Sequence, residues 1–363
     1  MKPKEQIIGL SPYHPGKPIE EVKREFKLTE VIKLASNENP FGPTPKVKQA
    51  ILEASDNLAL YPDGAAFELR QALAEYYRVN PDQLIFGNGS DEIVQIICRT
   101  FLTPGSNAVM AEPTFPRYKA NVIIEGAQAV EVPLKEGVYD LEAMAAAVNE
   151  HTRLVWVCNP NNPTGTHISE DELVSFLRQV PEDVLVVVDE AYYEYVTAED
   201  YPDTTRLLNQ YPNILILRTF SKIYGLAALR IGYGIARPEV VDWLNRVREP
   251  FNTSRVAQKA ALAALADQDY RAVCFEKNKQ GKEYFYRQFE VLNLAFYPTE
   301  ANFIMVDLGR PAQPVFDALL RQGVIVRSGE VLGMPTCLRI TIGSQEQNEK
   351  IIHLLSQTVH SVS

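Results

Sequence analysis

The chain has 363 residues, of which 46% are hydrophobic and 23% are charged, and it is long enough for two packed units. Its formal net charge is −10 and the sequence contains no long basic run, which argues against nucleic acid and anionic membrane surfaces as partners. A small anionic substrate is not excluded, because a local cluster of arginines can bind one.

The N-terminal residues contain no apolar signal-peptide core, and no apolar stretch is long enough to cross a bilayer. The four cysteines form no C-x-x-C pair, and the five histidines lack a metal-binding spacing. We therefore expect reduced cysteines, no metal site and a cytoplasmic location. The cysteines are Cys98, Cys158, Cys274 and Cys337.

The first 39 residues are rich in proline and charge, which predicts an extended N-terminal arm outside the core. Short apolar runs and helical patterns then alternate along the chain. They predict an α/β fold, a mostly parallel sheet of seven strands covered by helices. Helices are expected after Ser90 and after Ser169, where Glu172 completes a capping box. The candidate strands are Leu84–Phe86, Ala108–Ala111, Ala129–Val132, Leu154–Cys158, Val184–Val188, Ile214–Leu217 and Ile231–Ala236.

After Val240 the pattern changes to helices with an interruption at Pro250, and a long charged and aromatic helix runs from Tyr270 to Leu292. Short strands and one more helix follow, which predicts a small α+β domain. The later elements are expected at Ala301–Val306, Pro314–Gln322, Val324–Arg327 and Leu338–Ile342. The predicted division is an arm at 1–39, a large domain at 40–247 and a small C-terminal domain at 248–363.

One segment, from Thr219 to Gly234, carries the most specific chemical signal. Lys222 follows an apolar strand, with hydroxyl side chains at Thr219 and Ser221, and Arg230 comes eight positions later. An aldehyde cofactor with a phosphate group needs an amine to form an imine, and hydroxyls with a guanidinium to hold the phosphate. A solvated lysine at a strand end is the alternative, so the hypothesis depends on partners elsewhere in the chain.

Three other motifs supply such partners. Asn162 lies in a loop that prolines and a glycine fix, although a plain turn is the alternative. Asp189 ends a buried strand, where α/β sheets bind ligands, and Tyr192 follows three residues later; a helix cap is the alternative for Asp189. The backbone N–H groups of Ser90 and Asp91, after a glycine-rich turn, suit a phosphate at a helix start.

The order of these motifs, with the Pro-Thr-Phe segment at 113–115, resembles the fold-type-I pyridoxal-phosphate aminotransferases over nearly the whole chain. The resemblance implies pyridoxal 5'-phosphate as the cofactor and three catalytic residues, which are Lys222, Asp189 and Tyr192. Lys222 joins the cofactor aldehyde as an imine and then moves the proton at the substrate Cα. Asp189 pairs with the pyridine nitrogen, which makes the ring an electron sink. Asn162 and Tyr192 hydrogen-bond the ring hydroxyl.

The resemblance also implies how the rest of the cofactor is held. Phe115 stacks on the ring, where many relatives have tyrosine, so stacking is kept and a hydroxyl contact is lost. Tyr61 reaches the phosphate from the partner subunit, which implies a homodimer. The phosphate is held by Ser90, Asp91, Thr219, Ser221 and Arg230.

Further segments are similar to the histidinol-phosphate aminotransferases of histidine biosynthesis; they include 34–43, 61–63, 248–254, 299–303, 324–327 and 338–343. The implied reaction moves an amino group between L-histidinol phosphate and 2-oxoglutarate, giving imidazole acetol phosphate and L-glutamate. Both substrates are small anions, so arginines are expected around them. The resemblance assigns Arg339 to a carboxylate, Arg327 and Tyr13 to the substrate phosphate, and Asn39 and Asn302 to the same pocket.

Three other functions remain open at this point. A broader aromatic aminotransferase would use the same scaffold, and scattered pocket residues separate the two poorly. A lyase similar to threonine-phosphate decarboxylase would share the scaffold and the phosphate handling. A catalytically silent cofactor-binding module is disfavoured, because the whole set of motifs around Lys222 is intact.

Overall fold

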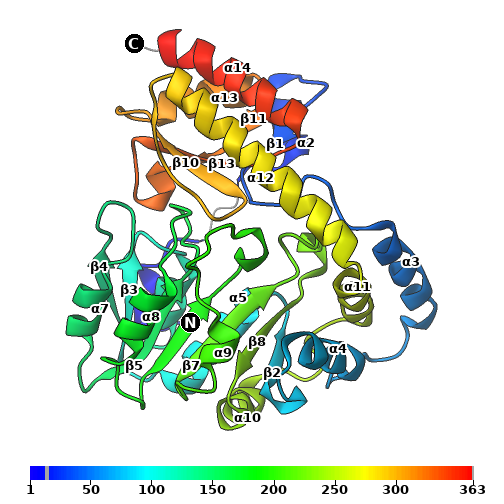
Figure 1. Ribbon diagram of the computed structural model, residues 1–363, viewed down its shortest axis with the longest axis vertical. Coiled ribbons are helices and arrows are strands. Elements are labelled where there is room, and N and C mark those ends of the chain that lie inside the picture. Colours follow the sequence, from blue (N-terminus) through cyan, green and yellow to red (C-terminus); the bar gives the residue numbers. More distant parts are fainter. Residues whose placement is uncertain (13–15, 362–363) are drawn as a thin grey trace.

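The computed structural model describes residues 1–12 and 16–361, so the predicted substrate residue Tyr13 lies outside the described part of the chain. The two larger of the three sheets in these residues are a seven-stranded sheet in the larger lower half and a four-stranded sheet in the upper half (Figure 1). The long helix α12 (Gln268–Val291) runs from the larger half, beside α11 (Arg255–Leu265), to the smaller sheet. The cleft between the halves is the place where both sheets can contribute side chains to one site.

The larger sheet has the strand order β2-β8-β7-β6-β5-β3-β4. Its strands are parallel except for β8, which runs antiparallel to both of its neighbours. The central strands are buried along their whole length, which explains their continuous Val, Ile and Leu runs. The strands are β2 (Leu84–Gly87), β3 (Asn107–Glu112), β4 (Gln128–Pro133), β5 (Thr152–Cys158), β6 (Leu185–Asp189), β7 (Ile214–Thr219) and β8 (Gly232–Ala236). The predicted fold class, a mostly parallel seven-stranded sheet with helices, is confirmed.

Helices cover this sheet, and α3, α7, α8, α9 and α11 begin at a residue whose side chain caps the first turn. The side chain of Ser169 accepts a hydrogen bond from the Glu172 N–H at the start of α8, which confirms the predicted capping box. In α5 the residues Ile93, Ile96 and Ile97 are buried, as their spacing predicts. The helices of this half are α3 (Pro45–Ala54), α4 (Phe67–Tyr77), α5 (Ser90–Phe101), α6 (Arg117–Ile124), α7 (Leu141–Ala147), α8 (Glu170–Leu177), α9 (Thr204–Leu207), α10 (Pro238–Val247) and α11.

The smaller half is an antiparallel sheet packed against helices, as expected for an α+β unit. Its strand order is β12-β13-β10-β9, and one face packs on α12, α13 and α14. No helix in the described residues combines the length and the apolarity that crossing a membrane requires. The elements are β9 (Ala295–Tyr297), β10 (Phe303–Asp307), α13 (Gln313–Arg321), β12 (Arg327–Ser328), β13 (Cys337–Thr341) and α14 (Gln345–Ser361).

The N-terminal segment differs from the extended arm that its composition predicts. It contains α1 (Glu5–Ile8), the amphipathic helix α2 (Ile19–Phe26) and the short strand β1 (Ile32–Lys33). Strand β1 pairs in parallel with β11 (Val324–Ile325) of the smaller half. Val22 is buried against that half, because α2 places its few apolar residues on one face, and Ala35, which follows β1, is buried in the same cluster. The three-part domain division remains our proposal.

A buried ion pair ties the two halves together beside α12. The Lys282 Nζ lies 3.2 Å from the Glu300 carboxylate and donates to the Thr197 hydroxyl at 2.7 Å. Glu300 also accepts from the backbone N–H of Thr197 at 2.5 Å. The side chains of Lys282 and Glu300 are only 7% and 16% exposed, so each charge depends on the other for compensation.

We expect Lys282→Met to lower the free energy of unfolding by about 2–3 kcal/mol, because it leaves the Glu300 carboxylate buried without its cation. The double variant Lys282→Met/Glu300→Gln should recover part of that loss, since no buried charge remains. Urea unfolding followed by circular dichroism measures both. As a control, Lys259→Met, which breaks the exposed pair with Glu68, should cost less than about 1 kcal/mol. Equal losses in the two single variants would contradict the prediction.

Candidate active site

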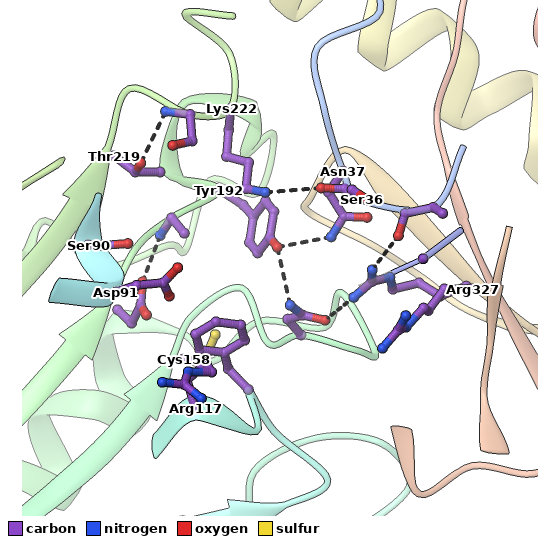
Figure 2. A pocket seen from close by; sticks show the side chains of 18 of the residues that line it. Ser36, Asn37, Ser90, Asp91, Arg117, Cys158, Tyr192, Thr219, Lys222 and Arg327 are labelled. Atoms are coloured by element: carbon purple, nitrogen blue, oxygen red, sulfur yellow. Dashed lines mark hydrogen bonds between the residues drawn. The ribbon is translucent and has the colours of Figure 1, made fainter. Parts of the chain in front are cut away.

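A cavity of about 470 Å³ lies where the carboxyl ends of β5, β6 and β7 meet the N-terminus of α5 and the strands β12 and β13. This is the edge at which parallel sheets bind ligands. Figure 2 shows its lining, with Lys222 and Tyr192 side by side, Ser90, Asp91 and Thr219 on one side and Arg327 on the other. The structure thus brings together side chains that are far apart in the sequence.

Lys222 projects into this cavity from the loop after β7. Its Nζ donates to the backbone oxygen of Ser36 at 3.3 Å and lies 5.5 Å from the centre of the Tyr192 ring. Burial among protein atoms and the nearby Arg339 guanidinium lower the pKa of the lysine from 10.5 to about 8. A much larger fraction of this amine than of a solvated lysine is therefore neutral near pH 7–8, as a nucleophile or base requires.

Asp189 ends β6 and is buried in the cavity floor. Its Oδ2 accepts from the Tyr118 hydroxyl at 2.5 Å, and its Oδ1 accepts from the Ala191 N–H at 3.1 Å. Burial raises the pKa of the carboxyl to about 6, although both hydrogen bonds act in the opposite direction. A carboxylate in this position favours a cationic partner, such as a protonated ring nitrogen.

Tyr192 is the centre of a hydrogen-bond network that crosses the cavity. Its Oη accepts from the Asn37 Nδ2 at 3.0 Å and from the Asn162 Nδ2 at 3.3 Å. The Asn162 Oδ1 accepts from the Arg339 Nη1 at 2.5 Å, and the Arg339 Nη2 donates to the Ala35 oxygen at 2.8 Å. Because both amides donate to the phenol oxygen, the one phenolic proton is left for a group inside the cavity.

An anion-binding cradle lies at the other end of the cavity. Ser90 and Asp91 begin α5, where free N–H groups and the helix dipole favour a negative group. The Arg230 guanidinium reaches the same place, 3.3 Å from the Asp91 carboxylate and 3.3 Å from the Ser221 Oγ. Gly89, with φ of +79°, lies so close that a Cβ there would overlap this guanidinium. The Thr219 hydroxyl accepts from the Ser221 N–H at 3.0 Å and so shapes the wall.

Other predicted site residues divide into two groups. Phe115 and Arg327 line the cavity, and Arg327 is the register partner of Arg339 on the neighbouring strand. Asn39 and Asn302 are buried behind the wall and are not among its lining residues. They donate to the backbone oxygens of Ile223 and Asn37, respectively, so they support neighbours of Lys222 and Tyr192 instead.

Tyr61 lies outside the cavity of its own chain. Its side chain is 78% exposed and stacks on Phe251, with ring centres 4.7 Å apart. An exposed aromatic pair on the surface is compatible with a contact to a second subunit.

Sequence reasoning missed three residues of the site. Asn37 adopts a positive φ of 56° and holds Tyr192, and Tyr118 holds Asp189. Arg117, the first residue of α6, lines the cavity beside Phe115. The position of Tyr118 and Arg117 just after the Pro-Thr-Phe segment was the available signal, but neither residue belongs to a motif with a stated role.

Taken as a donor set, the cavity fits a phosphorylated pyridine aldehyde. It offers the Lys222 amine of lowered pKa and the buried Asp189 carboxylate, which favours a cation. It also offers a cradle for an anion at Arg230, where a Cβ added at Gly89 would overlap the guanidinium. Phe115 supplies an aromatic face between them. The same arrangement does not resemble a metal site: among the described residues, no three His, Cys, Asp or Glu side chains are grouped to hold an ion.

Comparison with known proteins agrees with this geometry. The family model for class I and II aminotransferases matches residues 29–355. The chain therefore belongs to the class I and II aminotransferase family.

Within that family the chain is similar to the histidinol-phosphate aminotransferases. It is 61% identical over 357 residues to the one from Geobacillus sp. (strain WCH70), with 98% of each chain covered. It is 55% identical over 358 residues to the one from Bacillus subtilis (strain 168), covering 98% of this chain and 99% of the relative. The crystal structure of histidinol-phosphate aminotransferase from Sinorhizobium meliloti in complex with pyridoxal-5'-phosphate superimposes with a TM-score of 0.92, at 31% identity, over 99% and 98% of the two chains. The resemblance found in the motifs is confirmed.

The raised pKa of Asp189 predicts a pH-dependent stability of the protein without ligands. With a folded pKa of about 6 against an ordinary value of 3.8, the folded state binds more protons than the unfolded state between these values. Stability therefore falls as the pH rises from about 4 to about 6, by roughly 3 kcal/mol for this group. Asp189→Asn should lack this part of the decline.

Urea unfolding of the ligand-free wild type and variant between pH 4 and pH 7 measures the difference. Asp171→Asn, at an exposed position on α8, is the matched control and should follow the wild-type pH curve. Parallel pH curves for wild type and Asp189→Asn would show that burial does not perturb this carboxyl.

Proposed function

We propose that this chain is a pyridoxal-phosphate-dependent histidinol-phosphate transaminase. It transfers the amino group of L-glutamate to imidazole acetol phosphate, forming L-histidinol phosphate and 2-oxoglutarate for histidine biosynthesis. The observation that carries the proposal is the meeting, in one cavity, of the Lys222 amine, the Asp189 carboxylate and the Arg230 cradle. The likeness to histidinol-phosphate aminotransferases over the full chain supports the choice of substrate.

The cavity residues have matching roles toward the cofactor. When bound, pyridoxal phosphate supplies an electron-withdrawing ring that stabilises negative charge at the substrate Cα. Lys222 would hold its aldehyde carbon, Asp189 its ring nitrogen, and Phe115 its ring face. The ring hydroxyl would meet Asn162 and Tyr192. The phosphate would be held by Ser90, Asp91, Thr219, Ser221 and Arg230.

The protein's own groups then act on the substrate. The Lys222 Nζ, with its lowered pKa, accepts the proton from the substrate Cα. It then returns this proton to the carbon that would come from the cofactor aldehyde. Arg339 faces the cavity with its guanidinium already oriented by Asn162 and by the Ala35 oxygen, so it can receive a carboxylate without a search among rotamers. Arg327, its register partner, is the second cation at that end and would meet a phosphate.

The assembly and the location of the protein belong to the same proposal. The active unit would be a homodimer in which Tyr61 of one subunit reaches the phosphate cradle of the other; its exposure on the surface supports this. Tyr13 would approach the substrate phosphate. Asn39 and Asn302 would act from behind the wall, through Ile223 and Asn37. The enzyme would work in the cytoplasm on small anionic substrates.

Lys222→Ala should reduce turnover by at least about a thousandfold, because it removes both the covalent attachment and the proton carrier. The measurement is the single-turnover absorbance change of the cofactor on addition of glutamate or of histidinol phosphate. Lys119→Ala, an exposed lysine on α6, serves as the control and should behave as wild type.

The same assay tests the alternatives in the wild type. A specificity constant for phenylalanine equal to that for histidinol phosphate would make the chain a broad aromatic aminotransferase. Release of carbon dioxide without an oxo-acid acceptor would indicate a lyase, and a bound cofactor that responds to no amino donor would indicate a silent module.

Gly89→Ala should weaken binding of pyridoxal phosphate by about 10- to 100-fold, because the added Cβ displaces Arg230 and removes one charge-assisted contact. Equilibrium titration of the cofactor-free protein measures the change. Gly105→Ala is the control: its φ is also positive, but a Cβ there meets nothing within 4 Å. Unchanged affinity in Gly89→Ala would mean that Arg230 does not hold the phosphate.

A further inference from the structure

Basic side chains of the cavity outnumber the roles assigned above. Lys222, Arg230, Arg327 and Arg339 each have a role, and Arg117 has none. Its guanidinium forms no hydrogen bond and no ion pair with any described residue; only its backbone oxygen is engaged, by Asn121. A guanidinium stays charged at every accessible pH, so an unpaired one at a ligand cavity is a candidate for binding an anion.

Arg117 lies on a different wall from the other substrate arginines. It begins α6 on the larger half and lies near Cys158, at the end of β5 (Figure 2). Arg327 and Arg339 are register partners on β12 and β13 of the smaller half. The cavity therefore offers guanidinium groups from both halves of the molecule.

The acidic side chains that line the cavity do not neutralise Arg117. The Asp91 carboxylate pairs with Arg230, and Asp189 is held by Tyr118 and the Ala191 N–H in the cavity floor. The Arg117 guanidinium is therefore available to pair with an anionic group of a ligand.

The two substrates of the proposed reaction differ in their anionic groups, and this inference rests on that proposed function. Histidinol phosphate has one anionic end, its phosphate, which Arg327 and Arg339 can receive. Glutamate and 2-oxoglutarate have two carboxylates. When one occupies Arg339, the second has no counterpart in histidinol phosphate, and Arg117 is a cavity guanidinium on the larger half that could receive it.

We propose that Arg117 binds this second carboxylate and so determines specificity for the dicarboxylate half of the reaction. Its planar fork matches a carboxylate with two parallel hydrogen bonds. The imidazole of histidinol phosphate carries no negative charge, so it cannot form this ion pair, and it is repelled when protonated. Arg117 thus raises the affinity of the cavity for a dicarboxylate without raising its affinity for histidinol phosphate.

The test compares Arg117→Gln and Arg117→Lys with wild type in single-turnover reactions of the holoenzyme. The substrates are glutamate, glutamine and histidinol phosphate. In Arg117→Gln, kcat/KM for glutamate should fall by about 10- to 100-fold, mainly through KM, while that for histidinol phosphate stays within about threefold. Glutamine has the shape of glutamate without the second charge, so wild-type preference for glutamate over glutamine should nearly vanish in the variant. Arg117→Lys should restore part of it.

The controls separate this proposal from the proposed function. Arg178→Gln, an exposed arginine at the end of α8, should leave every rate unchanged. A wild type that converts neither glutamate nor histidinol phosphate would overturn the function itself. A normal wild type with equal losses for both substrates in Arg117→Gln would overturn only the role of Arg117, as would unchanged rates. A larger loss for histidinol phosphate would reassign Arg117 to the phosphate.

Discussion

A closed network of buried polar side chains joins the two halves of the molecule at the cavity, and the geometry of the site depends on it. Arg339 of the smaller sheet donates to Asn162, both Asn162 and Asn37 donate to Tyr192, and the Asn37 N–H donates to Thr341, two residues from Arg339. All five residues are buried, so loss of one member leaves a partner unsatisfied, at a cost of about 1–3 kcal/mol. The network therefore fixes the Arg339 guanidinium relative to the Tyr192 phenol before any ligand arrives, which is the kind of preorganisation that catalysis requires.

The charge of the cavity is opposite to that of the whole chain. The formal net charge is −10, yet basic side chains exceed acidic ones around the cavity, and the acidic Asp91 is already paired with Arg230. A concave surface of one sign attracts anionic substrates. The same surroundings act on Lys222, because burial and Arg339 together lower its pKa to about 8. Arg339 thus adds to the positive charge of the cavity and, after burial, also contributes to the lowered pKa of Lys222.

Sequence reasoning predicted the features that depend on contiguous residues. Each strand of the larger sheet was placed to within two residues at either end, because strands buried on both faces are continuous apolar runs. Helix α2 was not predicted, since its sequence is mostly charged and only Val22 is fully buried. Asn37, Tyr118 and Arg117 were also missed. Asn37 contacts Tyr192, 155 positions away, and Thr341, 304 positions away, and Tyr118 contacts Asp189, 71 positions away. Arg117 reaches the cavity only through the fold, so a local pattern contains no record of any of these three placements.

Two pairs of adjacent residues, Asp189 with Glu190 and Arg218 with Thr219, place one side chain in the cavity and the other on the opposite face of the sheet. Successive side chains of a strand point to opposite faces. At the ends of β6 and β7, Asp189 and Thr219 line the cavity, whereas their neighbours Glu190 and Arg218 do not. Glu190 and Arg218 form an ion pair at 2.7 Å, fully buried, and the guanidinium also packs 3.8 Å from the centre of the Tyr193 ring. Because a buried pair tolerates little displacement, it locks β6 and β7 in register directly behind the cavity floor. The Glu190–Arg218 ion pair thus fixes the position of Asp189 relative to Lys222 from the face of the sheet opposite the cavity.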